Sequence, residues 1–381
     1  MIRSIELFSG TGGLALGLQE SGFSHEALFE WDSSSCDNLR TNVLAGKCPG
    51  LADWKIVQGD VRNVNFTDYA GKIKFVAGGP PCQPFSMGGK GLAYNDERDM
   101  FPQAVRAVRE IRPQAFVFEN VKGLLRKSFS TYFNYIILQL TYPEIVRAPG
   151  MTWEEHLSFL EKCHTSSTRQ TLKYNVTYRL VNAADYGVPQ NRFRVIIVGF
   201  RDDINANWAF PEKTHSKEAL IFEQYCTGDY WDRFSLKAPS TCPYTKQQLL
   251  EVSDKCSTLY NLQPWRTVRD AIHDIVYNDD ISSASIHRTA KSYPGHSGSK
   301  LDEPSKTIKA GAHGVPGGEN MVILDDGSAR YYTIREAARI QTFPDSFVFS
   351  SSWTENMRQI GNAVPVELAR IIGESVSLHL S

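Results

Sequence analysis

Short apolar runs alternate with helix-like segments along the first 201 residues of this 381-residue chain. Strands that alternate with helices are typical of the α/β class, in which helices cover both faces of a parallel sheet. The pattern therefore predicts a doubly wound, mostly parallel sheet. The expected strands are residues 2–8, 25–30, 55–58, 74–77, 115–119, 176–181 and 194–200, and the expected helices include residues 14–20, 33–44 and 100–111.

The pattern is irregular between residues 201 and 332, where prolines, glycines and serines separate short apolar pieces. Regular periodicity returns at Thr333, which forms a predicted capping box with Glu336. We therefore expect a larger α/β domain and a second, smaller, irregular β-rich domain. The larger domain comprises residues 1–201 and 356–381, the smaller one residues 202–355, and further helices are expected at 246–252, 268–275, 334–341 and 365–380.

Composition and charge narrow the class of protein. No apolar run approaches the length of a membrane span, and the first residues enter a strand pattern directly, so we expect no membrane segment and no signal peptide. Seven cysteines without a CxxC pair indicate free thiols, a cytoplasmic location and no structural metal. The 41 basic and 42 acidic residues leave a net charge of −1, so a polyanionic partner would need a local basic patch.

A glycine-rich turn follows the first expected strand. The segment Gly10–Ala15 fits G-x-G-x-x-[GA], and Glu30 lies twenty positions after the first glycine. This is the dinucleotide-binding fingerprint, so a nicotinamide-dependent dehydrogenase is one interpretation. Any adenosine-containing cofactor can use the same arrangement, with Trp31 stacking on adenine and Asp60 accepting from its amino group. Because no basic residue for phosphate accompanies the turn, S-adenosylmethionine is the better candidate.

The segment GGPPCQPFS, residues 78–86, places prolines and glycines around Cys82. Further short motifs occur before and after it in a fixed order. Together they resemble the DNA (cytosine-5)-methyltransferases, most closely those of bacterial restriction–modification systems. The matching stretches are FSGTGG (8–13), Glu30-Trp31, Asp60, PPCQ (80–83), ENV (119–121), QNRFR (190–194), REAARIQTFPD (335–345) and GNAVP (361–365).

The resemblance implies a Rossmann-like methyltransferase fold and a defined chemistry. Cys82 would add to carbon 6 of a cytosine flipped out of the duplex, which makes carbon 5 nucleophilic toward the methyl group. Glu119 would provide a proton or hydrogen bond to N3. Arg194 would pair with O2 of the base, and Arg192 would support the same loop, although alternate arginines on a strand can also form one solvated face.

The resemblance also assigns cofactor and DNA contacts. S-adenosylmethionine would lie against the glycine turn and the final motif, and double-stranded DNA would contact the loop after Cys82 and the segment 286–332. Several of the basic residues can equally be ordinary surface charges that contact only solvent. The expected cofactor-binding residues are Phe8, Gly10, Thr11, Gly12, Gly13, Glu30, Trp31, Asp60, Val61, Pro80, Asn362 and Val364, and the expected DNA-binding residues are Gln83, Ser86, Lys90, Arg98, Lys291, Lys306 and Lys309.

Three alternatives stay open at this point. A tRNA-methylating branch shares the catalytic core, but its usual Cys-Phe-Thr tripeptide is absent. The dehydrogenase interpretation leaves Cys82, Glu119 and Arg194 unexplained. The third alternative is a regulator that binds the cofactor without catalysis, and the intact methyltransferase motifs argue against it. For the favoured interpretation we expect a monomer and a separately acting cognate restriction endonuclease, while segments 126–173 and 201–265 match no motif.

Overall fold

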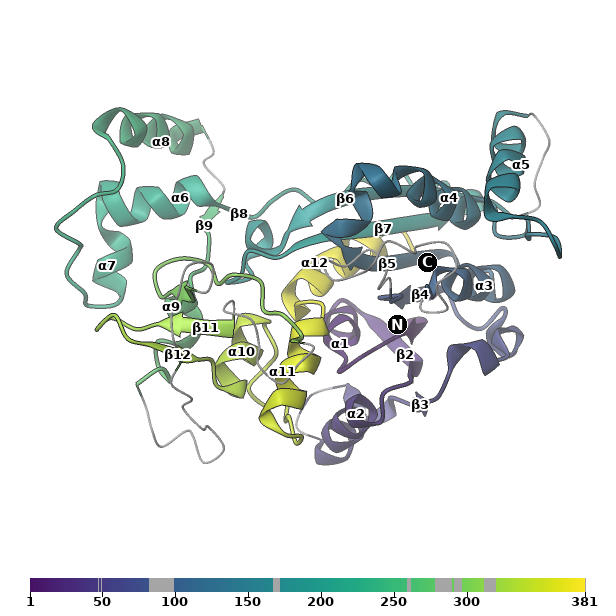
Figure 1. The fold of residues 1–381 in the computed structure, drawn as a ribbon, viewed down its shortest axis with the longest axis horizontal. Helices are drawn as coiled ribbons and strands as arrows, with labels where there is room; N and C mark the ends of the chain where they lie inside the picture. Colours follow the sequence, from purple (N-terminus) through teal and green to yellow (C-terminus); the bar gives the residue numbers. More distant parts are fainter. Residues whose placement is uncertain are drawn as a thin grey trace.

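The structure is a computed structural model that describes residues 1–46, 48, 50–81, 99–166, 172–258, 262–277, 290, 297–311 and 320–380. A seven-stranded sheet with the order β3-β2-β1-β4-β5-β7-β6 forms its centre (Figure 1). The pairs from β3 to β5 are parallel, whereas β7 is antiparallel to both β5 and β6. The strands are β1 Ile2–Leu7, β2 Phe23–Glu30, β3 Ile56–Gln58, β4 Phe75–Gly78, β5 Ala115–Val121, β6 Tyr174–Asn182 and β7 Phe193–Arg201.

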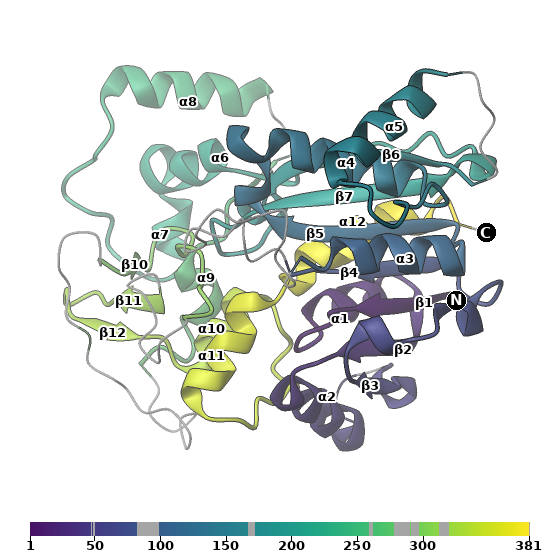
Figure 2. The same cartoon turned by 45° about the vertical axis from the view of Figure 1, so that its right-hand side comes forward.

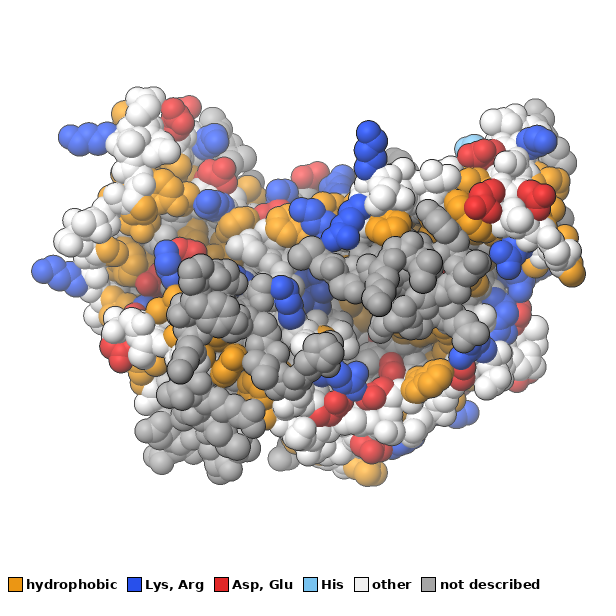
Figure 3. Space-filling model, viewed as in Figure 1, with side chains coloured by type: hydrophobic (Ala, Val, Ile, Leu, Met, Phe, Trp, Pro, Cys, Tyr) orange, Lys and Arg blue, Asp and Glu red, His pale blue; other side chains and the backbone are white. Residues whose placement is uncertain are grey.

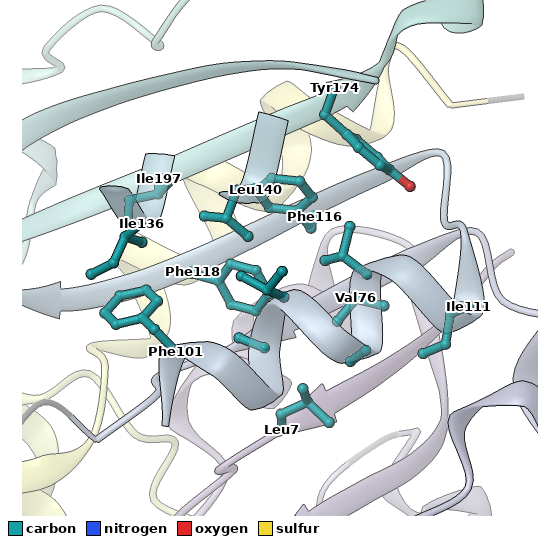
Figure 4. Close-up of a cluster of buried hydrophobic side chains, with 14 of the residues drawn as sticks. Leu7, Val76, Phe101, Ile111, Phe116, Phe118, Ile136, Leu140, Tyr174 and Ile197 are labelled. Atoms are coloured by element: carbon teal, nitrogen blue, oxygen red, sulfur yellow. The ribbon is translucent and has the colours of Figure 1, made fainter. Parts of the chain in front are cut away.

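Helices cover both faces of this sheet, which confirms the predicted doubly wound α/β class. On one face, α3 (Phe101–Ile111) and α4 (Ser130–Thr141) pack on strands β1, β4, β5 and β7. The opposite face is covered by α1 (Gly13–Glu20) and α12 (Val366–Ser377). Figure 4 shows the first of these cores, in which side chains of the strands meet Phe101, Ile111, Ile136 and Leu140 from the two helices.

The described residues between His215 and Asn362 form a second lobe beside the sheet (Figure 2). It contains a three-stranded sheet with the order β10-β11-β12 and a two-stranded pair, β8 and β9. Its helices include three at predicted positions, α8, α9 and α10. The elements are β8 His215–Ser216, α6 Lys217–Phe222, α7 Asp229–Arg233, α8 Lys246–Thr258, β9 Gln263–Pro264, α9 Val268–Ile272, β10 Ser299–Lys300, β11 Met321–Ile323, β12 Ala329–Tyr331, α10 Ile334–Ile340 and α11 Trp353–Asn362.

Local sequence signals explain several element boundaries. Asp32 accepts a hydrogen bond from the Ser35 amide and begins α2 (Ser33–Ala45). The capping box predicted at Thr333 and Glu336 is present and opens α10. A second capping box, at Thr152 and Glu155, opens α5 (Trp153–Thr165). Helices α4 and α5 lie in segment 126–173, where the sequence motifs predicted nothing.

The two lobes share apolar side chains. One buried cluster contains Ala15 and Leu39 of the first lobe together with Val268, Ile308 and Ile360 of the second. The predicted boundary between residues 355 and 356 falls inside α11. The division into two domains therefore stays a prediction, and the shared cluster indicates that the lobes fold against each other. In the described part of the chain, no helix is long and apolar enough to cross a membrane.

Candidate active site

The strand order brings the predicted site residues to one edge of the sheet. Because β1 to β5 are parallel, their carboxyl ends lie together, and antiparallel β7 begins at the same edge. The chain reverses direction across the sheet between β1 and β4, which is the topological switch point where α/β proteins bind ligands. The glycine turn, Glu30, Asp60, Pro80 and Glu119 follow or end five neighbouring strands there.

The turn after β1 has an unusual backbone. Gly10 and Gly12 have φ angles of 54° and 85°, in the left-handed region that favours glycine. Phe8 also has a positive φ, 56°, which is uncommon for a residue with a side chain. Strain of this kind occurs at ligand sites when the surrounding structure maintains it. The turn therefore has the backbone geometry of a ligand-binding loop.

The C-terminal motif lies directly beside this turn. A Cβ atom placed on Gly13 would lie 2.3 Å from the carbonyl oxygen of Val364. One turn further along α1, a Cβ on Gly17 would lie 2.3 Å from the carbonyl oxygen of Val366. Glycine is thus required for α1 and α12 to approach each other. The predicted cofactor residue Val364 lies against the glycine turn by this packing, and Asn362 lies two residues before it in the chain.

Glu30 is held by the glycine turn itself. Its Oε2 accepts a hydrogen bond of 2.7 Å from the Gly10 amide, and its Oε1 accepts one of 2.8 Å from the Asp32 amide. Burial raises the pKa of Glu30, while these two backbone bonds act in the opposite direction. The adjacent Trp31 is 67 % exposed, a large fraction for an indole ring. A fixed carboxylate beside an open aromatic ring fits an adenosine group.

Asp60 has a different set of partners from the one expected. Its Oδ1 accepts from the Arg62 amide at 2.9 Å, and its Oδ2 accepts from Arg62 Nε at 2.8 Å. The hydrogen bond from the Arg62 side chain is the largest cause of a lowered pKa for Asp60. A carboxylate keeps free lone pairs after two such bonds, so adenine binding by Asp60 stays a prediction. The neighbouring Val61 is buried.

Two buried polar atoms near the turn have no hydrogen-bond partner in the described structure. They are Thr11 Oγ1, within the glycine turn, and Glu6 Oε2, on the strand that leads into it. Burial raises the pKa of Glu6 well above its usual value, with a smaller contribution from Glu30. Buried polar atoms normally have partners, and exceptions concentrate at functional sites. These unsatisfied oxygens, with the glycine turn, fit a polar ligand such as S-adenosylmethionine.

The ends of β5 and β7 hold a buried ion pair. Arg194 Nε lies 2.5 Å from Glu119 Oε1, and both side chains are nearly buried. Arg194 faces Val121 in the ladder, so it is the diagonal neighbour of Glu119 across the two strands. The structure thus brings together the predicted proton donor and the predicted O2 ligand. Their proximity follows from the antiparallel β5–β7 pairing, which short sequence motifs do not reveal.

Asn120, the middle residue of the ENV motif, has a structural role that the sequence did not indicate. Its Nδ2 donates to the Pro80 carbonyl oxygen at 2.9 Å. The Met100 amide donates to the Pro81 carbonyl oxygen at 3.2 Å. The two bonds hold Pro80 and Pro81, at the start of the predicted catalytic loop, against β5 and α3. The expected loop residues Cys82, Gln83, Ser86, Lys90 and Arg98 lie outside the described residues.

Arg192 lies away from the ion pair and is fully buried. Its guanidinium donates to the carbonyl oxygens of Ile308, Gly361 and Ala363 at 3.1, 2.8 and 2.9 Å. Arg192 therefore connects the start of β7 with Ile308, in the segment predicted to contact DNA, and with the C-terminal motif. These contacts are those of a supporting residue, and they do not bring its charge to the base site beside Glu119.

Lys309, in the segment predicted to contact DNA, packs closely on the same motif. A Cβ on Gly361 would lie 2.5 Å from the carbonyl carbon of Lys309. The Lys309 backbone pairs in both directions with the Asn320 side chain at 2.9 Å. Lys306 Nζ donates to Ser297 Oγ at 2.8 Å. Lys309 therefore lies beside the C-terminal motif, Lys306 is bound to Ser297, and Lys291 lies outside the part that the structure describes.

The fold is Rossmann-like, and the edge of its sheet carries a glycine turn beside a carboxylate–guanidinium pair. The family model described as C-5 cytosine-specific DNA methylase matches residues 2–142 and 161–378. The chain belongs to this family, and it is a DNA (cytosine-5)-methyltransferase of the type found in restriction–modification systems. The dehydrogenase alternative is therefore not retained, and DNA is the substrate class.

Named relatives are similar along nearly the whole chain. The type II methyltransferase M.NgoMIV of Neisseria gonorrhoeae is 30% identical over 98% of this chain and 96% of its own length. M.Eco47II of Escherichia coli is 32% identical over 99% of this chain and 78% of its own length.

Solved structures share the fold at lower identity. A protein described as a DNA modification methyltransferase encoded within an E. coli prophage is 21% identical, with a TM-score of 0.58, and the match covers 99% of both chains. The S. pombe Dnmt2 methyltransferase is 16% identical, with a TM-score of 0.57, over 99% of this chain and 98% of its own. Both support the predicted fold.

Proposed function

We propose that this enzyme methylates carbon 5 of a flipped-out cytosine in a specific double-stranded DNA sequence, through a covalent bond between Cys82 and carbon 6. The observation that carries the proposal is the Glu119–Arg194 pair at the edge where β5 and β7 meet. Cytosine has neighbouring acceptors at N3 and O2. The Glu119 carboxyl group can give a proton to N3, and the Arg194 guanidinium beside it can donate a hydrogen bond to O2.

Each protein group has a defined part in the proposed reaction. The Cys82 thiolate forms a bond to carbon 6, and the electron density moved toward N3 is neutralised by a proton from Glu119. Glu119 must therefore take up a proton as the base binds, and Arg194 then turns its charge toward O2. After carbon 5 has gained the methyl group, a water molecule accepts the carbon 5 proton. The electron pair of that C–H bond restores the carbon 5–carbon 6 double bond and releases Cys82 as a thiolate, and the N3 proton returns to Glu119.

The methyl donor would be S-adenosylmethionine, which supplies a methyl group on a positively charged sulfur. Glu30 would accept hydrogen bonds from the ribose hydroxyls, since the Gly10 and Asp32 amides already fix its orientation. Trp31 would stack on adenine. Thr11 and Asn362 would offer polar atoms to the remainder of the molecule, and the buried Val364 would form an apolar wall.

Sequence specificity would reside in the segment 286–332, which includes Lys291, Lys306 and Lys309. Lys90 and Arg98 would contact phosphates after the loop closes, and Gln83 and Ser86 would contact the site of the extruded base. Exchanging 286–332 for the matching segment of a relative should change the methylated sequence and preserve methyl transfer. An active chimera with an unchanged target would place recognition elsewhere.

The protein would act as a monomer in the cytoplasm, with a separate cognate endonuclease.

A mechanism-based trap tests the chemistry. In a duplex with 5-fluorocytosine at the target, fluorine cannot leave carbon 5 as a cation, so the bond to the enzyme cannot be released. We expect an adduct that requires S-adenosylmethionine, survives denaturation and maps to Cys82 by peptide mass spectrometry. The target sequence would first be found by bisulfite sequencing of DNA from cells that express the chain.

Two cysteine variants serve as a matched pair for this experiment. Cys82→Ala should abolish both adduct and product while DNA binding persists. Cys163→Ala changes a partly exposed, free thiol on α5 and should leave both unchanged. Full activity of Cys82→Ala, or an adduct on another cysteine, would contradict the proposed mechanism.

A further inference from the structure

A basic turn lies immediately beyond the Glu119–Arg194 pair. It comprises the short 3-10 helices η5 (Lys122–Leu125) and η6 (Lys127–Phe129), which connect β5 to α4. Its basic residues are Lys122, Arg126 and Lys127, and all three are exposed. Neither the motifs nor the expected DNA contacts include this turn.

The only charged residues around this turn in the sequence are basic. From residue 120 to residue 143 the sequence contains three basic residues and no aspartate or glutamate. Within the described residues, Lys122, Arg126 and Lys127 form no ion pair with a carboxylate. Many other arginines of this structure are paired, including Arg106, Arg194 and Arg370. The turn thus keeps its positive charge available to an external anion, although the whole chain is nearly neutral.

The turn is also held firmly in place. Leu124 is completely buried in the core on the α3 and α4 face of the sheet. The Arg126 amide donates to the Gly123 carbonyl oxygen at 3.2 Å, and the Phe129 amide donates to the Arg126 carbonyl oxygen at 2.8 Å. Ordered positions reduce the entropic cost of binding, so these charges can act at defined points.

Its position relative to the base site follows from the strand ladder. Val121 faces Arg194, so Lys122 is the next residue outward from the ion pair. Lys122 Nζ lies 4.9 Å from the ring centroid of Phe193, which is 41 % exposed. Figure 3 shows lysine and arginine side chains gathered at the upper centre of this face, between the two lobes. Lys122 therefore lies at the exposed end of the strand pair that carries the ion pair.

We propose that Lys122, Arg126 and Lys127 bind backbone phosphates of the DNA strand beside the extruded cytosine. The inference rests on the proposed function, because a base bound at Glu119 and Arg194 must have its flanking phosphates next to this turn. A nucleotide rotates out of the duplex about its backbone, so phosphates on either side need to be held while the base leaves the stack. Such contacts add affinity and register without reading sequence.

The salt dependence of DNA binding tests this proposal. A triple variant, Lys122→Gln with Arg126→Gln and Lys127→Gln, would be titrated against a fluorescently labelled duplex of mixed sequence at several salt concentrations. Each lost phosphate contact reduces the slope of log K against log salt by about 1, so we expect a reduction of about 2 to 3. A second triple variant exchanges lysine and arginine and so keeps the charge: Lys122→Arg with Arg126→Lys and Lys127→Arg. It should have most of the native slope.

A matched control removes equal charge from other surfaces. Lys55, Lys72 and Lys162 are exposed residues on the β3 side and on α5, and their triple change to Gln should leave the slope unchanged. S-adenosylmethionine binding would verify that every variant is folded. An unchanged slope in the Lys122 triple variant, or an equal reduction in the control, would overturn the phosphate assignment. If the native protein produced no 5-methylcytosine, the proposed function would be contradicted, even if the triple variant had the reduced slope.

Discussion

The parallel half of the central sheet, from β3 to β4, and the antiparallel half, from β5 to β6, present different chemistry at the same edge. The parallel half offers backbone amides, glycines with positive φ and a carboxylate that those amides orient. The antiparallel half offers the buried charges of Glu119, Arg194 and Arg192. A cofactor without phosphates can be bound by backbone shape, whereas addition to a cytosine ring requires groups that move or stabilise charge.

This comparison teaches where substitutions should affect chemistry and where they should affect binding or folding. In the antiparallel half, single charged side chains would transfer a proton or stabilise charge. In the parallel half, cofactor binding would be distributed over several backbone groups. The following experiments test that difference, beginning with the largest expected effect.

The change Glu119→Gln should reduce the rate of methyl transfer by about 10² to 10⁴, because an amide cannot deliver the proton to N3. Single-turnover kinetics with saturating DNA would measure this rate. Glu110→Gln, on the solvent side of α3, alters a carboxylate that pairs with Arg106 and should have no comparable effect. Near-native activity of Glu119→Gln would remove Glu119 from the proposed proton transfer.

The change Arg192→Met should destabilise the fold by about 3 to 5 kcal/mol, since it removes the Arg192 donor from three buried carbonyl oxygens, of which only that of Ala363 keeps a bond from Gln341. Urea unfolding would measure the loss. The matched variant Arg194→Met, two residues away, should retain most of the stability and lose activity. If both variants lost activity and neither lost stability, Arg192 would belong to the reaction site and not to its support.

His25, in the parallel half, should make folding sensitive to acid. Its Nε2 lies 2.9 Å from the Ala15 carbonyl oxygen, and burial lowers its pKa to about 4. As the pH falls below about 6.5, the unfolded chain binds a proton that the folded chain excludes, so stability falls until about pH 4, by about 3 kcal/mol in total.

Unfolding free energies between those pH values would measure this loss. His25→Gln should flatten the pH dependence, whereas His164→Gln, at an exposed position on α5, should not. An NMR titration that showed His25 protonated near pH 6 would contradict the prediction.

The change Glu30→Ala should weaken S-adenosylmethionine binding by about 1 to 3 kcal/mol, the range for hydrogen bonds to a charged group. Calorimetry without DNA would measure it. Asp37→Ala, an exposed residue on α2 that pairs with Arg40, is the matched control. Tight binding of NADH by the native chain, without binding of S-adenosylmethionine, would contradict the cofactor assignment.

The change Gly10→Ala should have the smallest effect on folding, about 1 to 2 kcal/mol. A Cβ there meets open space, so the cost comes only from the left-handed φ of 54°. Thermal unfolding would measure it. Gly13→Ala, where the added carbon would overlap the Val364 carbonyl, should cost clearly more. If the two changes lowered the stability equally, α12 would be able to shift away from the added carbon at position 13 at little energetic cost.

Several features could be predicted because they depend on local sequence. The strand–helix alternation, the cap at Asp32 and the box at Thr333 act within a few residues, and the structure confirms all three. The helices α4 and α5 were not predicted, although Thr152 and Glu155 form a capping box there. That signal was available in the sequence. By contrast, nothing local indicated that Asn120 would hold the Pro80 carbonyl.

The sequence by itself determined the order of the motifs, and with it the family, the glycine turn and the set of candidate reactive groups. Only the tertiary structure decided which of two arginines reaches Glu119. Spaced two residues apart, Arg192 and Arg194 would share one face of a regular strand. The strand begins only at Phe193, however, so Arg192 leaves the ladder and binds carbonyl groups from residues more than a hundred positions away. Such contacts depend on how distant segments pack, which no local pattern encodes.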